Sequence, residues 1–186
     1  MTDTIKRSQL LREVDALFKG PENWIVGQLF GKIASDDAPV YTTNTNKYTG
    51  KRFIPVETYD IEQADCFCIL GAIDKVLYAH GLLDPATDSL MAEAAKHALE
   101  YVLCAEERVF GPSPDQAAYI KNVEAKNVVI SDAKVYVFND NHTATFEELK
   151  SDLACAIALA EKRETDASNK PDDGSQDGGD YLEGDH

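Results

Sequence analysis

Basic residues are scarce in this sequence. Its 186 residues include 18 lysines and arginines against 33 aspartates and glutamates, which gives a formal net charge of −15. Nucleic acids and anionic membranes are bound through Lys and Arg side chains that neutralise phosphates, so this deficit disfavours both as partners. We expect instead a protein partner with a basic surface, because an acidic chain attracts one electrostatically.

Long apolar runs and cysteines are also few. No stretch approaches the roughly 18 apolar residues of a transmembrane helix. The first residues, MTDTIKRSQLLREVDALF, lack the apolar segment of a signal peptide. The four cysteines, Cys66, Cys68, Cys104 and Cys155, are too few for a disulfide framework in a chain of this length. We therefore expect a cytoplasmic protein.

Apolar residues at helical spacing indicate a mainly α (α+β) fold. Hydrophobic residues make up 44% of the chain, which is enough for a single compact domain. The spacing predicts helices over residues 3–18, 22–33, 60–80, 85–110, 115–123 and 145–162. In the helix over 60–80, the apolar stripe leaves Asp74 and Lys75 facing away, and Gly81 provides a left-handed cap.

Two segments are β-prone. Residues 36–58 hold β-branched and aromatic residues around an Asn-, Thr- and Gly-rich piece, which predicts a loose hairpin or a long loop. Residues 127–138 contain the runs Val128-Val129-Ile130 and Val135-Tyr136-Val137-Phe138, which predict one bent strand or a tight hairpin. The domain should therefore carry a small β element beside its helices.

The clearest local signal lies near the end of the sequence. Thr145 and Glu148 have the spacing of a capping box, and the apolar residues after them predict an amphipathic helix. Positions 166–186 then hold seven acidic residues against one lysine and few apolar ones. Such a segment cannot offset the entropy cost of ordering, so we predict a folded domain over 1–164 and a disordered acidic tail over 165–186.

Several of these residues together resemble a known family. The pattern consists of Trp24 with Gly27, then Cys68-Ile69-Leu70-Gly71-Ala72-Ile73, then Phe138-Asn139-Asp140, and finally Thr145, Glu147-Glu148-Leu149, Leu153 and Ala156-Ile157. It is similar to an uncharacterised family, a domain of unknown function, of small helical proteins from bacteria and their phages. The resemblance covers roughly residues 5–162. It implies a helical fold in a bacterial or phage-infected cell, and it implies no activity.

Asn139, Asp140 and His142 follow the second β-prone run and precede the last helix. One interpretation is a loop site in which Asn139 and Asp140 bind a substrate and Asp140 and His142 act as acid or base. The other is structural, because Asn and Asp side chains commonly close turns by accepting hydrogen bonds from backbone amides. We favour the structural interpretation, since it accounts for the residue types without a substrate.

Cys68 is a third catalytic candidate. A nucleophilic cysteine needs a pKa lowered by a helix N-terminus or a cation, and a base within reach. The pattern places Cys68 about two turns inside the helix over 60–80, where the terminal dipole has faded, so a buried apolar role is favoured. Cys66 and Cys68 would point about 160° to 200° apart on such a helix. We therefore expect no metal site, and no motif indicates a cofactor.

Lys47, Lys51 and Arg52 form the one basic group, among aromatic residues of the segment 36–58. This composition suits a phosphate or a nucleic acid strand. Three basic residues on a loop are weak support against the repulsion of an acidic chain, and the acidic tail is an equally available partner.

These features favour a non-enzymatic accessory protein that binds another macromolecule and is encoded by a phage or a mobile element. One alternative is a small hydrolase or transferase with its site around Asn139, Asp140 and His142. Another is a structural component of a virion. The sequence leaves the oligomeric state open.

Overall fold

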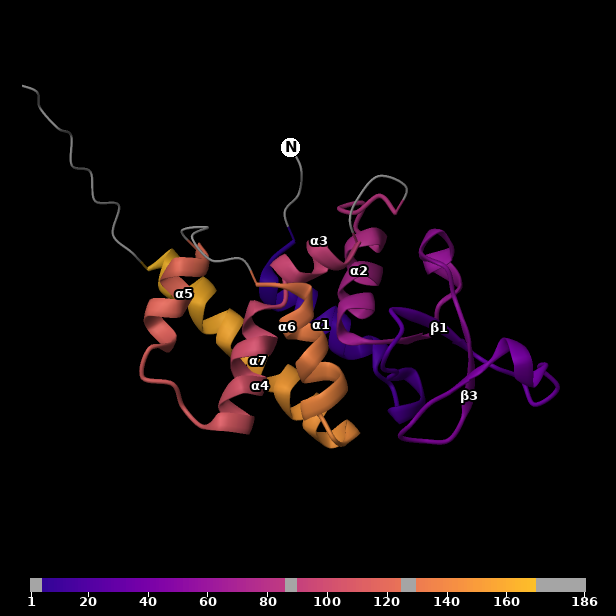
Figure 1. Ribbon diagram of the computed structural model, residues 1–186. Coiled ribbons are helices and arrows are strands. Elements are labelled where there is room, and N and C mark those ends of the chain that lie inside the picture. The colour runs from indigo at the N-terminus through magenta and orange to yellow at the C-terminus, as the bar shows by residue number, and fades with distance from the viewer. Residues whose placement is uncertain (1–4, 86–89, 125–129, 170–186) are drawn as a thin grey trace, which may run out of the picture.

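The computed structural model describes residues 5–85, 90–124 and 130–169, and it confirms a mainly helical fold with one small sheet. Figure 1 shows the helices gathered into one body, with the sheet projecting at one side. The helices are α1 (Arg7–Leu17), α2 (Ile69–Ala79), α3 (Leu90–Lys96), α4 (Leu99–Phe110), α5 (Gln116–Glu124), α6 (Asp132–Val137) and α7 (Phe146–Ser168). The strands are β1 (Phe30–Ile33), β2 (Asn44–Thr45), β3 (Arg52–Pro55) and β4 (Cys66–Phe67). Short 3₁₀ helices lie at Pro21–Asn23, Val40–Thr42 and Thr58–Gln63, and a π-helical turn lies at Phe138–His142.

α7 packs along both α1 and α4 and begins at the predicted capping box. Thr145 Oγ1 accepts a 3.1 Å hydrogen bond from the Glu148 amide, and Glu148 Oε2 accepts a 3.2 Å hydrogen bond from the Thr145 amide. The predicted stripe faces the core through the buried residues Leu149, Leu153, Ala156 and Ala160. The helix continues to Ser168, beyond residue 164. Most of the predicted tail, residues 170–186, lies outside the described residues.

The sheet has the strand order β2-β3-β1-β4, and neighbouring strands are antiparallel. β2 and β3 form a hairpin, which is one of the two possibilities that the sequence leaves open for residues 36–58. Buried Asn46 ties this hairpin to the helical body, because its Nδ2 donates a 2.7 Å hydrogen bond to the Trp24 carbonyl. The projecting part of the molecule is thus anchored at its base.

The helix predicted over residues 22–33 is wrong. Pro21–Asn23 is a single 3₁₀ turn, and the chain then extends through buried Trp24 to β1. Gly27 has a φ of +74°, a left-handed conformation that a helix interior does not accept. The apolar residues of this segment therefore reach the core from extended backbone.

The helix predicted over residues 60–80 is divided. Thr58–Gln63 is a 3₁₀ helix, Cys66–Phe67 forms β4, and α2 starts only after Cys68. The Gly71 amide donates a hydrogen bond to Cys68 Sγ at 3.5 Å. Cys68 is therefore the N-cap of α2, and its predicted position two turns inside a helix is wrong.

Asp74 of α2 is buried, whereas the sequence pattern places it on the outer face. The face that carries Asp74 is covered because α3 packs against α2. Neither carboxyl oxygen has a hydrogen-bond partner among the described residues. Burial, and to a smaller extent the negative charge of Glu93, raises the pKa of Asp74 to about 9, so the group is protonated at neutral pH. Gly81, with a φ of +66°, follows the end of α2 as predicted.

Two further segments differ from the predictions. Residues 131–138 are helical, because the Lys134 amide donates to Ser131 Oγ at 3.2 Å and α6 then packs on α2 and α3. This packing overrides the β-propensity of the valines, and residues 127–129 of the predicted β element lie outside the described part of the chain. The helix predicted over 85–110 is two helices, α3 and α4, separated at residues 97–98.

Cys104 of α4 and Cys155 of α7 form a disulfide, with Cα atoms 6.0 Å apart. The sequence does not predict this pairing, because a separation of 51 residues carries no pairing information. The bond joins two helices that also pack against each other. Cys66 and Cys68 are free and buried.

Candidate functional site

Asn139 lies at the centre of a buried junction. Its Oδ1 accepts hydrogen bonds from Trp24 Nε1 at 2.9 Å and from the Ile69 amide at 3.3 Å. Its Nδ2 donates to the Ile25 carbonyl at 3.5 Å and to Asp140 Oδ1 at 2.5 Å. These hydrogen bonds hold three segments of the chain together. Because Asn139 is only 1% exposed, its carboxamide does not face solvent.

Asp140 lies next to this junction and is half-buried. Its Oδ2 accepts a 3.0 Å hydrogen bond from the Gly27 amide, and Lys47 Nζ donates a 2.7 Å hydrogen bond to its backbone carbonyl. The Tyr136 hydroxyl is also hydrogen-bonded to the Asp140 carboxylate, which raises the pKa of Tyr136. The carboxylate thus binds the backbone amide of a segment 113 residues away in the sequence, whereas the structural interpretation expects it to close a local turn.

His142 lies beside two aromatic rings, and Cys68 is buried in the core. The His142 ring lies 5.9 Å from the Phe110 ring and 5.5 Å from the Phe138 ring, measured between centroids. Cys68 is 2% exposed, and burial raises its pKa to about 12. Its thiol therefore stays protonated at neutral pH, although the thiolate is the nucleophilic form.

The three residues of the predicted basic group have separate partners. Lys47 binds the backbone of the π-helical turn, as described above. Lys51 Nζ lies 3.9 Å from a Glu22 carboxylate oxygen, and the Arg52 guanidinium donates a 2.7 Å hydrogen bond to the Ala38 carbonyl. These side chains hold loops of their own chain in place, and each one binds a different segment.

Within residues 5–85, 90–124 and 130–169, no group of three or more His, Cys, Asp and Glu side chains could hold a metal ion. No helix in these ranges is long enough and apolar enough to cross a bilayer. The free thiols of Cys66 and Cys68 lie in the core, on β4 and at the N-cap of α2.

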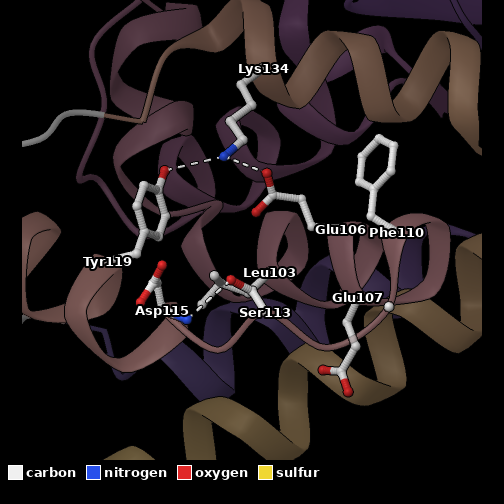
Figure 2. A pocket seen from close by; sticks show the side chains of 9 residues that line it. Leu103, Glu106, Glu107, Phe110, Ser113, Asp115, Tyr119 and Lys134 are labelled. Carbon is white, nitrogen blue, oxygen red and sulfur yellow. Dashed lines mark hydrogen bonds and ion pairs between the residues drawn. The ribbon is translucent and has the colours of Figure 1, made fainter.

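A hollow of about 380 Å³ lies between the end of α4, α5 and the start of α6. Its lining combines three carboxylates, two aromatic rings and one cation, from Glu106, Glu107, Asp115, Phe110, Tyr119 and Lys134 (Figure 2). The Phe110 side chain is largely in solvent, since the residue is 71% exposed. Carboxylates and aromatic faces both attract cations, so this lining suits a basic group.

Lys134 reaches from α6 between Glu106 and Tyr119, as Figure 2 shows. Its Nζ lies 2.6 Å from Glu106 Oε1, 3.4 Å from the Tyr119 hydroxyl and 4.7 Å from the Tyr119 ring centroid. Burial alone would lower the pKa of Lys134, but its interactions with Glu106 and Tyr119 outweigh burial and raise the pKa. The ammonium group therefore stays charged, held between a carboxylate and an aromatic ring.

None of the residues that line the hollow was singled out as a site by its sequence. They come from α4, the loop that joins α4 to α5, α5 itself and α6, and only the fold brings α6 to the other three. Lys134 falls in a segment for which the sequence predicts a β element. The only sequence signal that relates to the hollow is the excess of acidic residues.

Comparison with known proteins gives a family and no activity. A protein-family model described as "Family of unknown function (DUF6197)" matches residues 3–159. This range includes the junction at Asn139 and every residue of the hollow. No curated protein and no solved structure matches the chain.

Proposed function

The chain belongs to the Family of unknown function (DUF6197), whose description names no activity, and we propose from its own surface that it is a non-enzymatic binding protein. Its partner is a protein with a basic surface. It acts as an accessory factor in the cytoplasm of a bacterial or phage-infected cell. The observation that carries this proposal is the acidic and aromatic hollow at the exposed Phe110.

The charges around the hollow support a basic partner. Of its three carboxylates, only Glu106 takes part in an ion pair within the described part of the chain. Glu107 and Asp115 add negative charge at the same place. A net charge of −15 over the whole chain also accelerates the approach of a basic protein and repels an acidic one.

The exposed ring of Phe110 supports a protein partner over a free cation. Aromatic side chains are enriched in the central contacts of protein interfaces, where they bury large apolar areas. Phe110 is held at the edge of the hollow by an edge-on contact with Phe138, with ring centroids 6.4 Å apart. A partner would bury this ring while its basic groups meet the carboxylates.

The experiment is a pull-down from nuclease-treated bacterial lysate with the immobilised full chain. A double variant, Glu107→Gln with Asp115→Asn, serves as the matched control, because it keeps side-chain size and removes two charges. We expect the wild type to retain specific basic proteins at low salt, and the variant and moderate salt to reduce this retention. If wild type and variant retain the same proteins, or neither retains any, the proposal is wrong.

A further inference from the structure

Resting on the proposed function, we propose that the hollow receives a lysine or arginine side chain of the basic partner, and that Lys134 holds this position in the free protein. The chain's own ammonium group is then a built-in competitor, which the partner displaces. Two features support this: the contacts of Lys134, and the carboxylates that Lys134 leaves unpaired.

The contacts of Lys134 define a site for a cationic side chain. A carboxylate of Glu106 lies 2.6 Å from the ammonium nitrogen, and the face of Tyr119 lies 4.7 Å from it. These are the two kinds of group that stabilise ammonium and guanidinium ions in proteins. An arginine would gain more than a lysine, because its planar guanidinium can bond Glu106 through two nitrogens and stack on Tyr119.

Lys134 can leave this position at low cost. Its side chain is 32% exposed, and it is carried by α6, a helix of six residues. An ion pair that is partly in solvent contributes about 1 kcal/mol or less, so exchanging one cation for another changes the free energy little. The partner gains further attraction from Glu107 and Asp115, which line the same hollow.

Besides a basic side chain, the partner needs an apolar one, and Phe110 is the residue that it would contact. Its ring lines the hollow and is 71% exposed, so it offers an apolar contact beside the charged groups. A segment that fits both features carries a basic side chain next to an apolar one. A purely hydrophilic polycation would meet the carboxylates and leave the ring in water.

The probe is a short labelled peptide in which arginine and leucine alternate with glycine, and fluorescence anisotropy measures its affinity for the full chain. Lys134→Gln removes the competitor and is expected to tighten binding roughly fivefold, whereas Glu106→Gln weakens binding by a similar factor. Lys134→Arg keeps a competitor that holds this position more strongly than lysine does, so the peptide is expected to bind it less tightly than the wild type.

Lys51→Gln is the matched control. It removes the same charge and frees the carboxylate of Glu22, on the side of the molecule that carries the sheet, and the peptide affinity should stay unchanged. A second readout needs no variant. Titration of the isotope-labelled wild type should shift the amide resonances of Glu106, Phe110, Tyr119 and Lys134 and leave Gly27 and Asp140 unshifted.

The outcomes separate this inference from the function on which it rests. Equal tightening by Lys134→Gln and Lys51→Gln, or resonance shifts centred outside the hollow, would overturn the docking site and leave a basic partner in place. Absence of peptide binding to the wild type and to every variant would overturn both the docking site and the proposed binding of a basic partner.

Discussion

Trp24 Nε1 donates a 2.9 Å hydrogen bond to Asn139 Oδ1, across 115 residues of sequence. The same oxygen accepts the amide of Ile69 at the start of α2. One carboxamide therefore joins the segment before the sheet, the first turn of a core helix and the π-helical turn. Because the donors are buried, they have no access to water if this acceptor is lost.

Asn139→Ala should lower the free energy of unfolding by about 3 kcal/mol, because it leaves buried N–H donors without an acceptor. Urea denaturation measures this change. Asn141→Ala is the control, since Asn141 is exposed and its replacement should cost less than about 0.5 kcal/mol. Equal costs for the two variants would contradict the role of the junction.

Gly71→Ala should also destabilise the protein, by about 3 kcal/mol. A Cβ at this position would lie 2.0 Å from the Leu29 carbonyl oxygen, so the backbone of α2 and the segment before β1 would have to separate. Gly50→Ala tests the alternative that any glycine is costly to replace. Gly50 has a φ of +70° and open space around it, so only its backbone strain of about 1 kcal/mol is expected. Thermal melting of both variants measures the two losses of stability, and equal losses would contradict a specific contact at Gly71.

Local signals in the sequence predict some of these elements well. The Thr145–Glu148 capping box and the glycine that follows α2 depend on a few neighbouring residues, and both are where the sequence places them. Other predictions fail where distant residues decide. Val135 and its neighbours favour a strand by propensity, yet the cap at Ser131 and the packing on α2 and α3 make them helical. Asp74 is buried because distant elements pack on α2, namely α1, α3 and α6.

Asp74 should make stability depend on pH. Its pKa is about 9 in the folded protein against an ordinary value of 3.8, so the folded state holds a proton that the unfolded chain releases. The stabilisation is complete below pH 3.8 and is lost as the pH rises toward 9, by roughly 4 kcal/mol at most between pH 5 and pH 8. Thermal melts at these two pH values measure the effect. Asp74→Asn, which cannot ionise, should lose clearly less stability over this interval than the wild type.

The disulfide between Cys104 and Cys155 should stabilise the protein by about 4 kcal/mol, because it closes a loop of 51 residues in the unfolded chain. We expect a reductant to lower the melting temperature of the oxidised wild type. The double variant Cys104→Ala with Cys155→Ala should melt at the same temperature with and without reductant. A wild-type melting temperature that does not respond would contradict a bond between these helices. In a reducing cytoplasm, thiol trapping should find both cysteines free.

Of the candidate sites, the sequence indicates the junction at Asn139 and Asp140, and it does not indicate the hollow. The sequence draws attention to Asn139 and Asp140 because polar residues stand between two regular segments, and the structure gives both a role within the fold. The hollow has no such signal, since α4, α5 and α6 each contribute residues that are ordinary on a helix surface. The proposal of a basic partner starts from the net charge, and the proposed binding place depends on the folded chain.

Site-specific photo-cross-linking in bacterial cells tests whether a basic partner binds at the hollow. Phe110→benzoylphenylalanine places the cross-linker at the hollow, and Tyr59→benzoylphenylalanine places it at a position that is 73% exposed elsewhere on the chain. We predict that position 110 captures one or a few basic proteins, that Glu107→Gln with Asp115→Asn weakens this capture, and that position 59 captures none of them. Identical products at both positions, or no product at position 110, would contradict the binding of a basic partner at the hollow.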